Sequence, residues 1–284
     1  MNKTYILIIK KDDFDFKEIL GIPLLYYHFL RARNQNSSLF LVTDDQKYID
    51  FFNNCKLEKE ISDNCYITLS NCFEKDVKFN LTKKEALKII ESKEIKEKDF
   101  IIRTNKDFYS FRNIVKEYIN FKFIEKGVDI ENISTTYIGP EVNIEKGTKI
   151  TGDTHIYGKS CIGKNNLISS SYIENTNIKD DNKILNSHIV GAMIGCKNEI
   201  GPFCRMRGKA VIDNECVLGN FVEIKSSNIK DHVKIKHLSY IGDTFIEKNV
   251  NIGCGFVTAN YDGKRKYPTT IEENVFVGCN TTIV

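Results

Sequence analysis

A six-residue spacing of aliphatic side chains is the feature that most constrains how this chain folds. Six isoleucines stand six residues apart between positions 138 and 168, and the same step resumes at Ile194 and continues, with some shorter steps, to Ile283. Neither the helical period near 3.6 residues nor the alternation of a strand produces this spacing. It predicts a parallel β-helix in which three hexads form one triangular coil and successive coils stack at roughly 4.8 Å.

The repeat divides the chain into two unlike parts. Residues 1–127 predict a small α/β Rossmann-like domain that ends in a linker helix, and residues 128–284 predict a β-helix of about eight coils. In the first part we expect strands over residues 5–9, 39–43 and 100–103, and helices over residues 22–32, 83–92 and 110–126. The chain is therefore of a mixed fold class, a small α/β domain followed by a β-helix.

Charge and composition exclude several functions. The 41 basic and 38 acidic side chains leave a net charge of +3, which is too balanced for a protein whose main partner is nucleic acid. The apolar run over residues 5–9 is too short for a signal peptide or a membrane span, so we expect a cytoplasmic protein without a membrane partner. The nine cysteines include no Cys-x-x-Cys pair, which predicts reduced packing residues and no zinc site.

Stacking the hexads into coils brings distant side chains into columns. Arg207 and Lys225 each follow an aliphatic residue of the same face, so two cations should lie one above the other. Like charges at this spacing repel, and an anion such as a sugar phosphate bound between them would offset this repulsion. A plain solvated edge is the alternative interpretation. Two neighbouring columns add polar groups to the same edge: Glu223 with Tyr240, and Asn220 with His237 and Cys254.

A loop interrupts the ladder near its end. Residues 259–267 fit no hexad and should project from the coil that follows His237 and Tyr240. Asp262 and Gly263 form a turn signal, and the basic run at residues 264–266 is compatible with either solubility or ligand binding. Loops of this kind commonly carry function.

Six short segments, taken together, resemble a known enzyme family. They are residues 201–207, 219–225, 237–243, 249–253, 260–263 and 275–278, and their order and spacing both match. They are similar to the acetyltransferase domain of the bacterial N-acetylglucosamine-1-phosphate uridylyltransferase/glucosamine-1-phosphate N-acetyltransferases, the GlmU type. The resemblance is strongest over residues 195–284 and weak before residue 111.

The resemblance implies a left-handed coil and a homotrimer with active sites between subunits. It also implies acetyl transfer from acetyl-coenzyme A to glucosamine 1-phosphate, on the path to UDP-N-acetylglucosamine, a peptidoglycan precursor. His237 is the expected general base, because imidazole titrates near neutral pH, and Glu223 is expected to orient it or to raise its basicity. By matching motif, Arg207, Lys225 and Lys266 would hold the sugar phosphate, Tyr240 and Asn251 the sugar, and Asn260, Tyr261 and Cys279 the acetyl-coenzyme A.

The chain departs from the family pattern at two places. Residues 10–16 contain no glycine-rich loop for nucleotide phosphates, although residues 21–24 resemble the Gly-x-Pro segment that follows it. The first domain is therefore expected to be a shortened, degenerate relative of the family's nucleotidyltransferase domain. Asn105 stands about where the family has a magnesium ligand, so magnesium is expected only if the chain transfers uridylyl groups. Family members also continue for several coils beyond residue 284, and those coils complete the donor pocket. Two alternatives to acetyl transfer stay open: a uridylyltransferase or bifunctional enzyme, and an inactive scaffold or sugar-phosphate binder.

Overall fold

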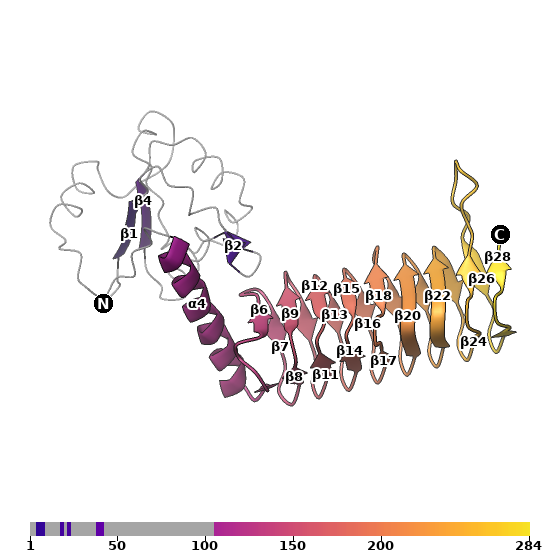
Figure 1. The fold of residues 1–284 in the computed structure, drawn as a ribbon, viewed down its shortest axis with the longest axis horizontal. Helices are drawn as coiled ribbons and strands as arrows, with labels where there is room; N and C mark the ends of the chain where they lie inside the picture. The colour runs from indigo at the N-terminus through magenta and orange to yellow at the C-terminus, as the bar shows by residue number, and fades with distance from the viewer. Residues whose placement is uncertain (1–3, 9–17, 20–21, 24–37, 43–104) are drawn as a thin grey trace. The chain divides into compact units, whose positions relative to one another are not determined.

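The computed structural model describes residues 4–8, 18–19, 22–23, 38–42 and 105–284, which belong to two compact units, residues 1–112 and 113–284. In the first unit, β1 (Thr4–Ile8) pairs in parallel with β4 (Ser38–Val42), and β2 (Glu18–Ile19) pairs antiparallel with β3 (Ile22–Pro23) (Figure 1). The two strands predicted over residues 5–9 and 39–43 are therefore confirmed to within a residue. The predicted helix over residues 22–32 is wrong at its start, because Ile22 and Pro23 pair with β2 instead.

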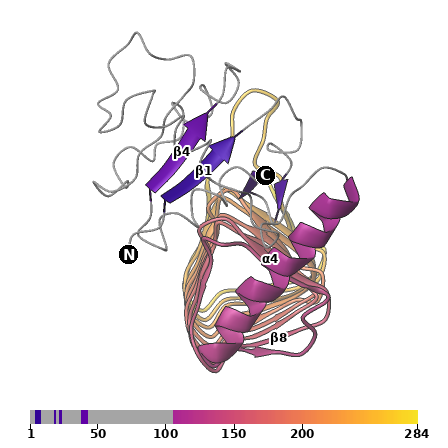
Figure 2. The same cartoon turned by 90° about the vertical axis from the view of Figure 1, so that its left-hand side faces the viewer.

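Other predicted elements of the first unit, over residues 24–32, 83–92 and 100–103, lie outside the described residues. The helix predicted from residue 110 begins earlier, because α4 spans Asn105–Glu125 and so starts at the residue proposed as a magnesium ligand. Its C-terminal half buries Ile119 and Phe123, and the Asn120 amide nitrogen donates to the carbonyl of Thr136 at 2.9 Å. Figure 2 shows this half lying across the first coils, which it caps. No helix among the described residues has the length and apolar character needed to cross a bilayer.

The second unit is a parallel β-helix with three stacks of strands. The first stack contains β6 (Thr136–Ile138), β9 (Thr154–Tyr157), β12 (Tyr172–Glu174), β15 (His188–Val190), β18 (Arg205–Arg207), β25 (Val257–Thr258) and β28 (Thr282–Ile283). The second contains β7 (Asn143–Ile144), β10 (Cys161–Ile162), β13 (Asn177–Ile178), β16 (Met193–Ile194), β19 (Val211–Ile212), β21 (Asn228–Ile229), β23 (Thr244–Ile246) and β26 (Thr269–Ile271). The third contains β5 (Asp129–Ile130), β8 (Lys149–Thr151), β11 (Leu167–Ser169), β14 (Lys183–Leu185), β17 (Glu199–Ile200), β24 (Asn251–Ile252) and β27 (Phe276–Val277). The eight-stranded second stack confirms the predicted parallel β-helix of about eight coils.

Two long strands join the third stack to the first. β20 (Val217–Lys225) and β22 (Lys234–Gly242) each pair with strands of both stacks, so each turns a corner of the prism without ending. Their aliphatic residues confirm the predicted inner columns, since Ile224 lies opposite both Met206 and Ile241. This corner carries the candidate site.

Amide side chains satisfy the backbone inside another corner. The Asn182 backbone N–H donates to Asn166 Oδ1 at 2.9 Å, and the Asn198 backbone N–H donates to Asn182 Oδ1 at 2.9 Å. All three side chains are buried. Because a buried polar group without a partner is costly, this amide ladder holds neighbouring coils in one register.

Candidate active site

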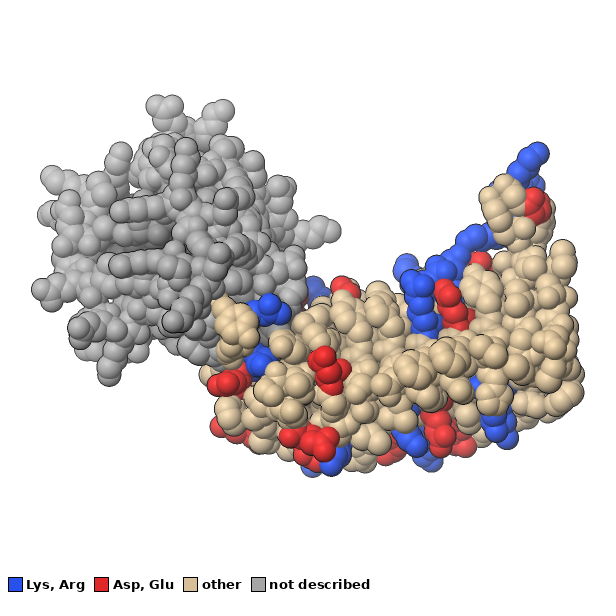
Figure 3. All heavy atoms as spheres, in the orientation of Figure 1, with Lys and Arg blue, Asp and Glu red and all other residues tan. Residues whose placement is uncertain are grey.

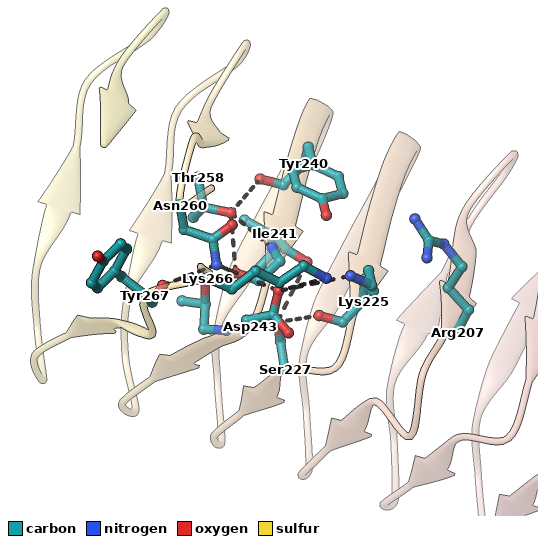
Figure 4. Close-up of polar contacts among 12 residues, drawn as sticks. Arg207, Lys225, Ser227, Tyr240, Ile241, Asp243, Thr258, Asn260, Lys266 and Tyr267 are labelled. Carbon is teal, nitrogen blue, oxygen red and sulfur yellow. Dashed lines mark hydrogen bonds and ion pairs between the residues drawn. The ribbon is translucent and has the colours of Figure 1, made fainter. Parts of the chain in front are cut away.

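The predicted stacking of two cations is confirmed. Arg207 lies opposite Lys225 in adjacent strands, and Gly242 follows in the same column one coil later. The Lys225 ammonium nitrogen lies 3.8 Å from Asp243 Oδ2, and the Lys266 ammonium nitrogen lies 3.8 Å from the same oxygen (Figure 4). The nearby Lys225 ammonium lowers the pKa of Lys266, while the Asp243 carboxylate opposes this shift. Two ammonium groups thus share one carboxylate, which leaves positive charge for an anionic ligand.

A second carboxylate holds the arginine of this column. Arg207 Nε donates to Glu223 Oε1 at 2.7 Å, and Arg205 Nη1 lies 4.0 Å from the same oxygen. Glu223 lies opposite Tyr240, as predicted, whereas His237 lies opposite Asn220 in a different column. The expected contact between Glu223 and His237 is therefore corrected: among the described residues the carboxylate is bound to arginine and orients the guanidinium.

His237 lies where β22 bends around the prism corner. Phe221 and Leu238 adopt positive φ angles of 60° and 44°, which turn β20 and β22 at this point. Gly219 is required in the bend, because a Cβ there would collide with the carbonyl of Lys236. The His237 side chain is exposed, and within the described residues its imidazole makes no hydrogen bond. Both ring nitrogens are thus available to a substrate.

The projecting loop is anchored at its base by Asn260. This side chain is only 8% exposed, and its amide nitrogen donates to the carbonyl of Gly242 at 3.1 Å and to that of Tyr267 at 3.0 Å. Its predicted contact with acetyl-coenzyme A stays a prediction, since the described bonds give the amide nitrogen an anchoring role. The anchor brings Lys266 back from the loop to the column of Lys225. Figure 3 shows basic side chains gathered along this edge and on the projecting loop.

The tip of the loop is closed by Asp262. One carboxylate oxygen accepts the backbone N–H groups of Lys264 at 2.7 Å and Arg265 at 2.6 Å, and the other accepts the Tyr267 hydroxyl at 3.0 Å. These bonds, with the backbone N–H groups of Arg265 and Lys264 contributing most, lower the pKa of Asp262. The carboxylate is therefore ionised at neutral pH and keeps the loop in one conformation.

The remaining predicted site residues lie on different parts of the coil. Tyr240 and Asn251 are half-buried, but they belong to different stacks, on either side of the His237 corner. Tyr261 is exposed on the loop, where its hydroxyl donates to the carbonyl of Gly263 at 2.7 Å. Cys279 is an exposed thiol in the last described coil. Within one chain, Lys225, Lys266 and Asp243 form one ionic cluster, which we call the clamp. His237 belongs to a different column of the same edge, five positions before Gly242 on β22.

The sequence reasoning missed one member of the cluster. Asp243 was not singled out, although it immediately follows Gly242 in the column of Lys225 and lies between the two lysines. The charge balance of the columns was the signal that could have identified Asp243. Two stacked cations in an exposed ladder predict a carboxylate in the next coil as readily as an external anion.

The fold and the polar corner define a hexapeptide-repeat β-helix protein with a cationic site on one prism edge. No family model matches the chain. Over the C-terminal 60% of its length, the chain is similar to proteins described as "Bifunctional protein GlmU", which confirms the resemblance drawn from the sequence. The relative from Staphylococcus haemolyticus is 39% identical over 171 residues, and that from Clostridium botulinum is 42% identical over 172 residues.

The extent of these matches is partial. Each match covers 60% of this chain and 38% of the relative, so the chain spans well under half the length of these curated relatives. A solved structure titled as the polySia specific acetyltransferase NeuO is 16% identical, with a TM-score of 0.22, over 55% of this chain and 81% of that chain. A putative acetyltransferase from Bacillus cereus is 15% identical, with a TM-score of 0.16, over 56% of this chain and 73% of that chain.

Proposed function

We propose that this chain is a cytoplasmic acetyltransferase that transfers the acetyl group of acetyl-coenzyme A to the amine of glucosamine 1-phosphate. The clamp carries the proposal: Lys225 and Lys266 share the Asp243 carboxylate at 3.8 Å each, beside Arg207. Four cations and two carboxylates make up this cluster when Arg205 and Glu223 are included, which favours a dianionic phosphate. The partial match to GlmU relatives supports the same assignment.

The proposed chemistry uses His237 as the base. An ammonium group must lose a proton before it attacks a thioester, and the exposed His237 imidazole is the proposed acceptor of that proton. The amine nitrogen then bonds to the acetyl carbon, the carbon–sulfur bond breaks, and the departing thiolate takes a proton. Release of free thiol from acetyl-coenzyme A that depends on glucosamine 1-phosphate tests the proposal. If no thiol is released, the scaffold or sugar-phosphate-binding alternative replaces it.

The clamp predicts a strong preference for the phosphorylated sugar. Lys225→Ala should weaken glucosamine 1-phosphate binding by about 10- to 150-fold, because a charge-assisted contact contributes about 1.5–3 kcal/mol. Calorimetry with glucosamine 1-phosphate and with glucosamine measures the difference. Lys234→Ala is the matched control and should leave binding unchanged, because Lys234 is exposed at the start of β22, at the opposite end of that strand from Gly242 and the clamp. Equal affinities for both sugars would mean that the cations bind no phosphate and form only a solvated edge.

We also propose that the protein works as a homotrimer. Tyr240 and Asn251 lie on opposite sides of the corner, so one chain does not gather all the predicted sugar contacts. The same corner exposes a line of apolar side chains: Phe203 and Phe221 stack with ring centroids 5.3 Å apart, and Leu238 follows at 58% exposure. Exposed apolar stripes of this kind favour association.

Light scattering checks the assembly. The expected mass is three times the chain mass of 32.7 kDa, and Phe221→Asp should shift it towards one chain, because a charge would be buried in the contact. Lys236→Asp changes a neighbouring exposed residue and serves as the charge control. A wild-type protein that stays a monomer at micromolar concentration would contradict the interfacial site.

A further inference from the structure

Two cysteines lie opposite each other in the last two described coils. On one side of the corner, Asn251 pairs with Phe276, and on the other side Val257 pairs with Thr282. Both pairs are 25 residues apart in sequence, so the same register holds across the corner and places Cys254 opposite Cys279. The backbone confirms this alignment on both flanks of Cys254. The Gly253 N–H donates to the carbonyl of Val277 at 2.9 Å, and the Asn280 N–H donates to the carbonyl of Cys254 at 2.7 Å.

The backbone spacing of this alignment suits a disulfide. Neighbouring strands are roughly 4.8 Å apart, which lies inside the range of about 4.4–6.8 Å that disulfides span between Cα atoms. Both residues are thiols in the structure, Cys279 exposed and Cys254 half-buried. The small neighbours Gly253 and Gly278 add no side chain beside them. The two Cα atoms are thus within the range that a disulfide spans, and the exposed Cys279 thiol is open to an oxidant.

From this arrangement we infer that Cys254 and Cys279 form a dithiol site that low-molecular-weight disulfides such as glutathione disulfide oxidise to an intramolecular disulfide. One protein thiolate attacks the reagent, which forms a mixed disulfide and releases the first glutathione. The second protein thiolate then attacks the mixed disulfide and releases the second glutathione. Two protein thiols and one reagent disulfide become one protein disulfide and two reagent thiols, so electrons and protons balance.

The site lies next to the candidate base. His237 and Cys254 are 17 residues apart, which is the offset of the pairs Ile235 with Ile252 and Tyr240 with Val257. His237, Cys254 and Cys279 therefore occupy one column over three coils. A consequence that rests on the proposed function is that closing the disulfide stiffens the corner beside His237 and lowers acetyl transfer, and that reduction restores it.

Peptide mapping of the full chain after treatment with glutathione disulfide tests the site. The expected product is a linked pair of peptides containing Cys254 and Cys279, in a protein that keeps its single-chain mass on a non-reducing gel. Cys279→Ser should lose the linked pair and carry one glutathione on Cys254. Cys161→Ser is the matched control and should keep the link, because Cys161 is exposed but lies opposite Asn143 and Asn177.

Two results would overturn the inference. One is separate glutathione adducts on Cys254 and Cys279 without a linked peptide, and the other is a link between two chains. Turnover is measured in parallel, before oxidation, after it, and after reduction with dithiothreitol. A protein without turnover before oxidation contradicts the proposed function. The linked peptide still shows in that case whether Cys254 and Cys279 form a dithiol site. Unchanged turnover in a fully linked protein contradicts the effect on the corner.

Discussion

Replacing His237 with alanine is expected to lower the turnover of acetyl-coenzyme A by about 10²- to 10⁴-fold, the loss typical of a removed general base. The imidazole is exposed at the bend of β22 and makes no hydrogen bond within the described part of the chain, so its removal disturbs no packing. Glucosamine 1-phosphate affinity should stay close to that of the wild type, because the clamp lysines contact Asp243 and not His237. Steady-state kinetics and calorimetry on one preparation separate these effects.

His232→Ala is the matched control for this experiment. His232 is also exposed, but it lies at another corner, where its Nδ1 is 3.4 Å from Glu215 Oε2. We expect turnover within twofold or so of the wild type, since surface pairs contribute little. Added imidazole should restore part of the activity of His237→Ala and should not change that of His232→Ala. Full turnover in His237→Ala would show that another group accepts the proton.

Replacing Phe256 with alanine is expected to destabilise the coils that carry the site by about 3–5 kcal/mol. Phe256 is completely buried and is the largest side chain in the interior of the coil, and its carbonyl accepts the Tyr240 N–H at 2.9 Å. Alanine leaves a cavity directly beneath the His237 corner. Because each coil contacts only its neighbours, the loss should concentrate in the coils around residue 256.

Denaturant unfolding followed by hydrogen exchange of individual amides measures this loss. The amides of Tyr240 and Val257 should exchange much faster in Phe256→Ala, while those of the coils next to α4 keep their protection. Phe276→Ala provides the comparison, because Phe276 is 72% exposed and its truncation should change stability by about 0.5 kcal/mol or less. Similar losses in both variants would mean that Phe256 is not a core residue of this coil.

Most of the coil could be predicted from the sequence, because one aliphatic residue per hexad is both the repeat and the core. Ile224, for example, lies between Met206 and Ile241 as the six-residue spacing requires. Column alignment also placed Arg207 over Lys225 correctly. In the N-terminal unit the period is not strict, and Ile22 and Pro23 form a strand where the apolar pattern favoured a helix.

The parts of the site that could not be predicted depend on side-chain reach. Register gives the column of each residue, but it does not say which of several neighbours a long side chain contacts. Glu223 was assigned to His237, and its carboxylate instead accepts Arg207 at 2.7 Å. Asn260 is expected by motif to contact acetyl-coenzyme A, which stays a prediction, whereas the bonds of its amide nitrogen to backbone carbonyls at the base of the loop were not predicted. These preferences follow from local geometry that spacing does not encode.

The helix α4 also covers the open end of the β-helix. A stack of parallel strands ends in a row of unpaired N–H and C=O groups, which is a template for adding further strands from other molecules. The C-terminal half of α4 crosses the first coils, buries Phe123 there and donates from Asn120 to the carbonyl of Thr136. The edge at this end is thereby closed to end-to-end growth, so the coil can be long and regular without seeding a fibre from its first strands.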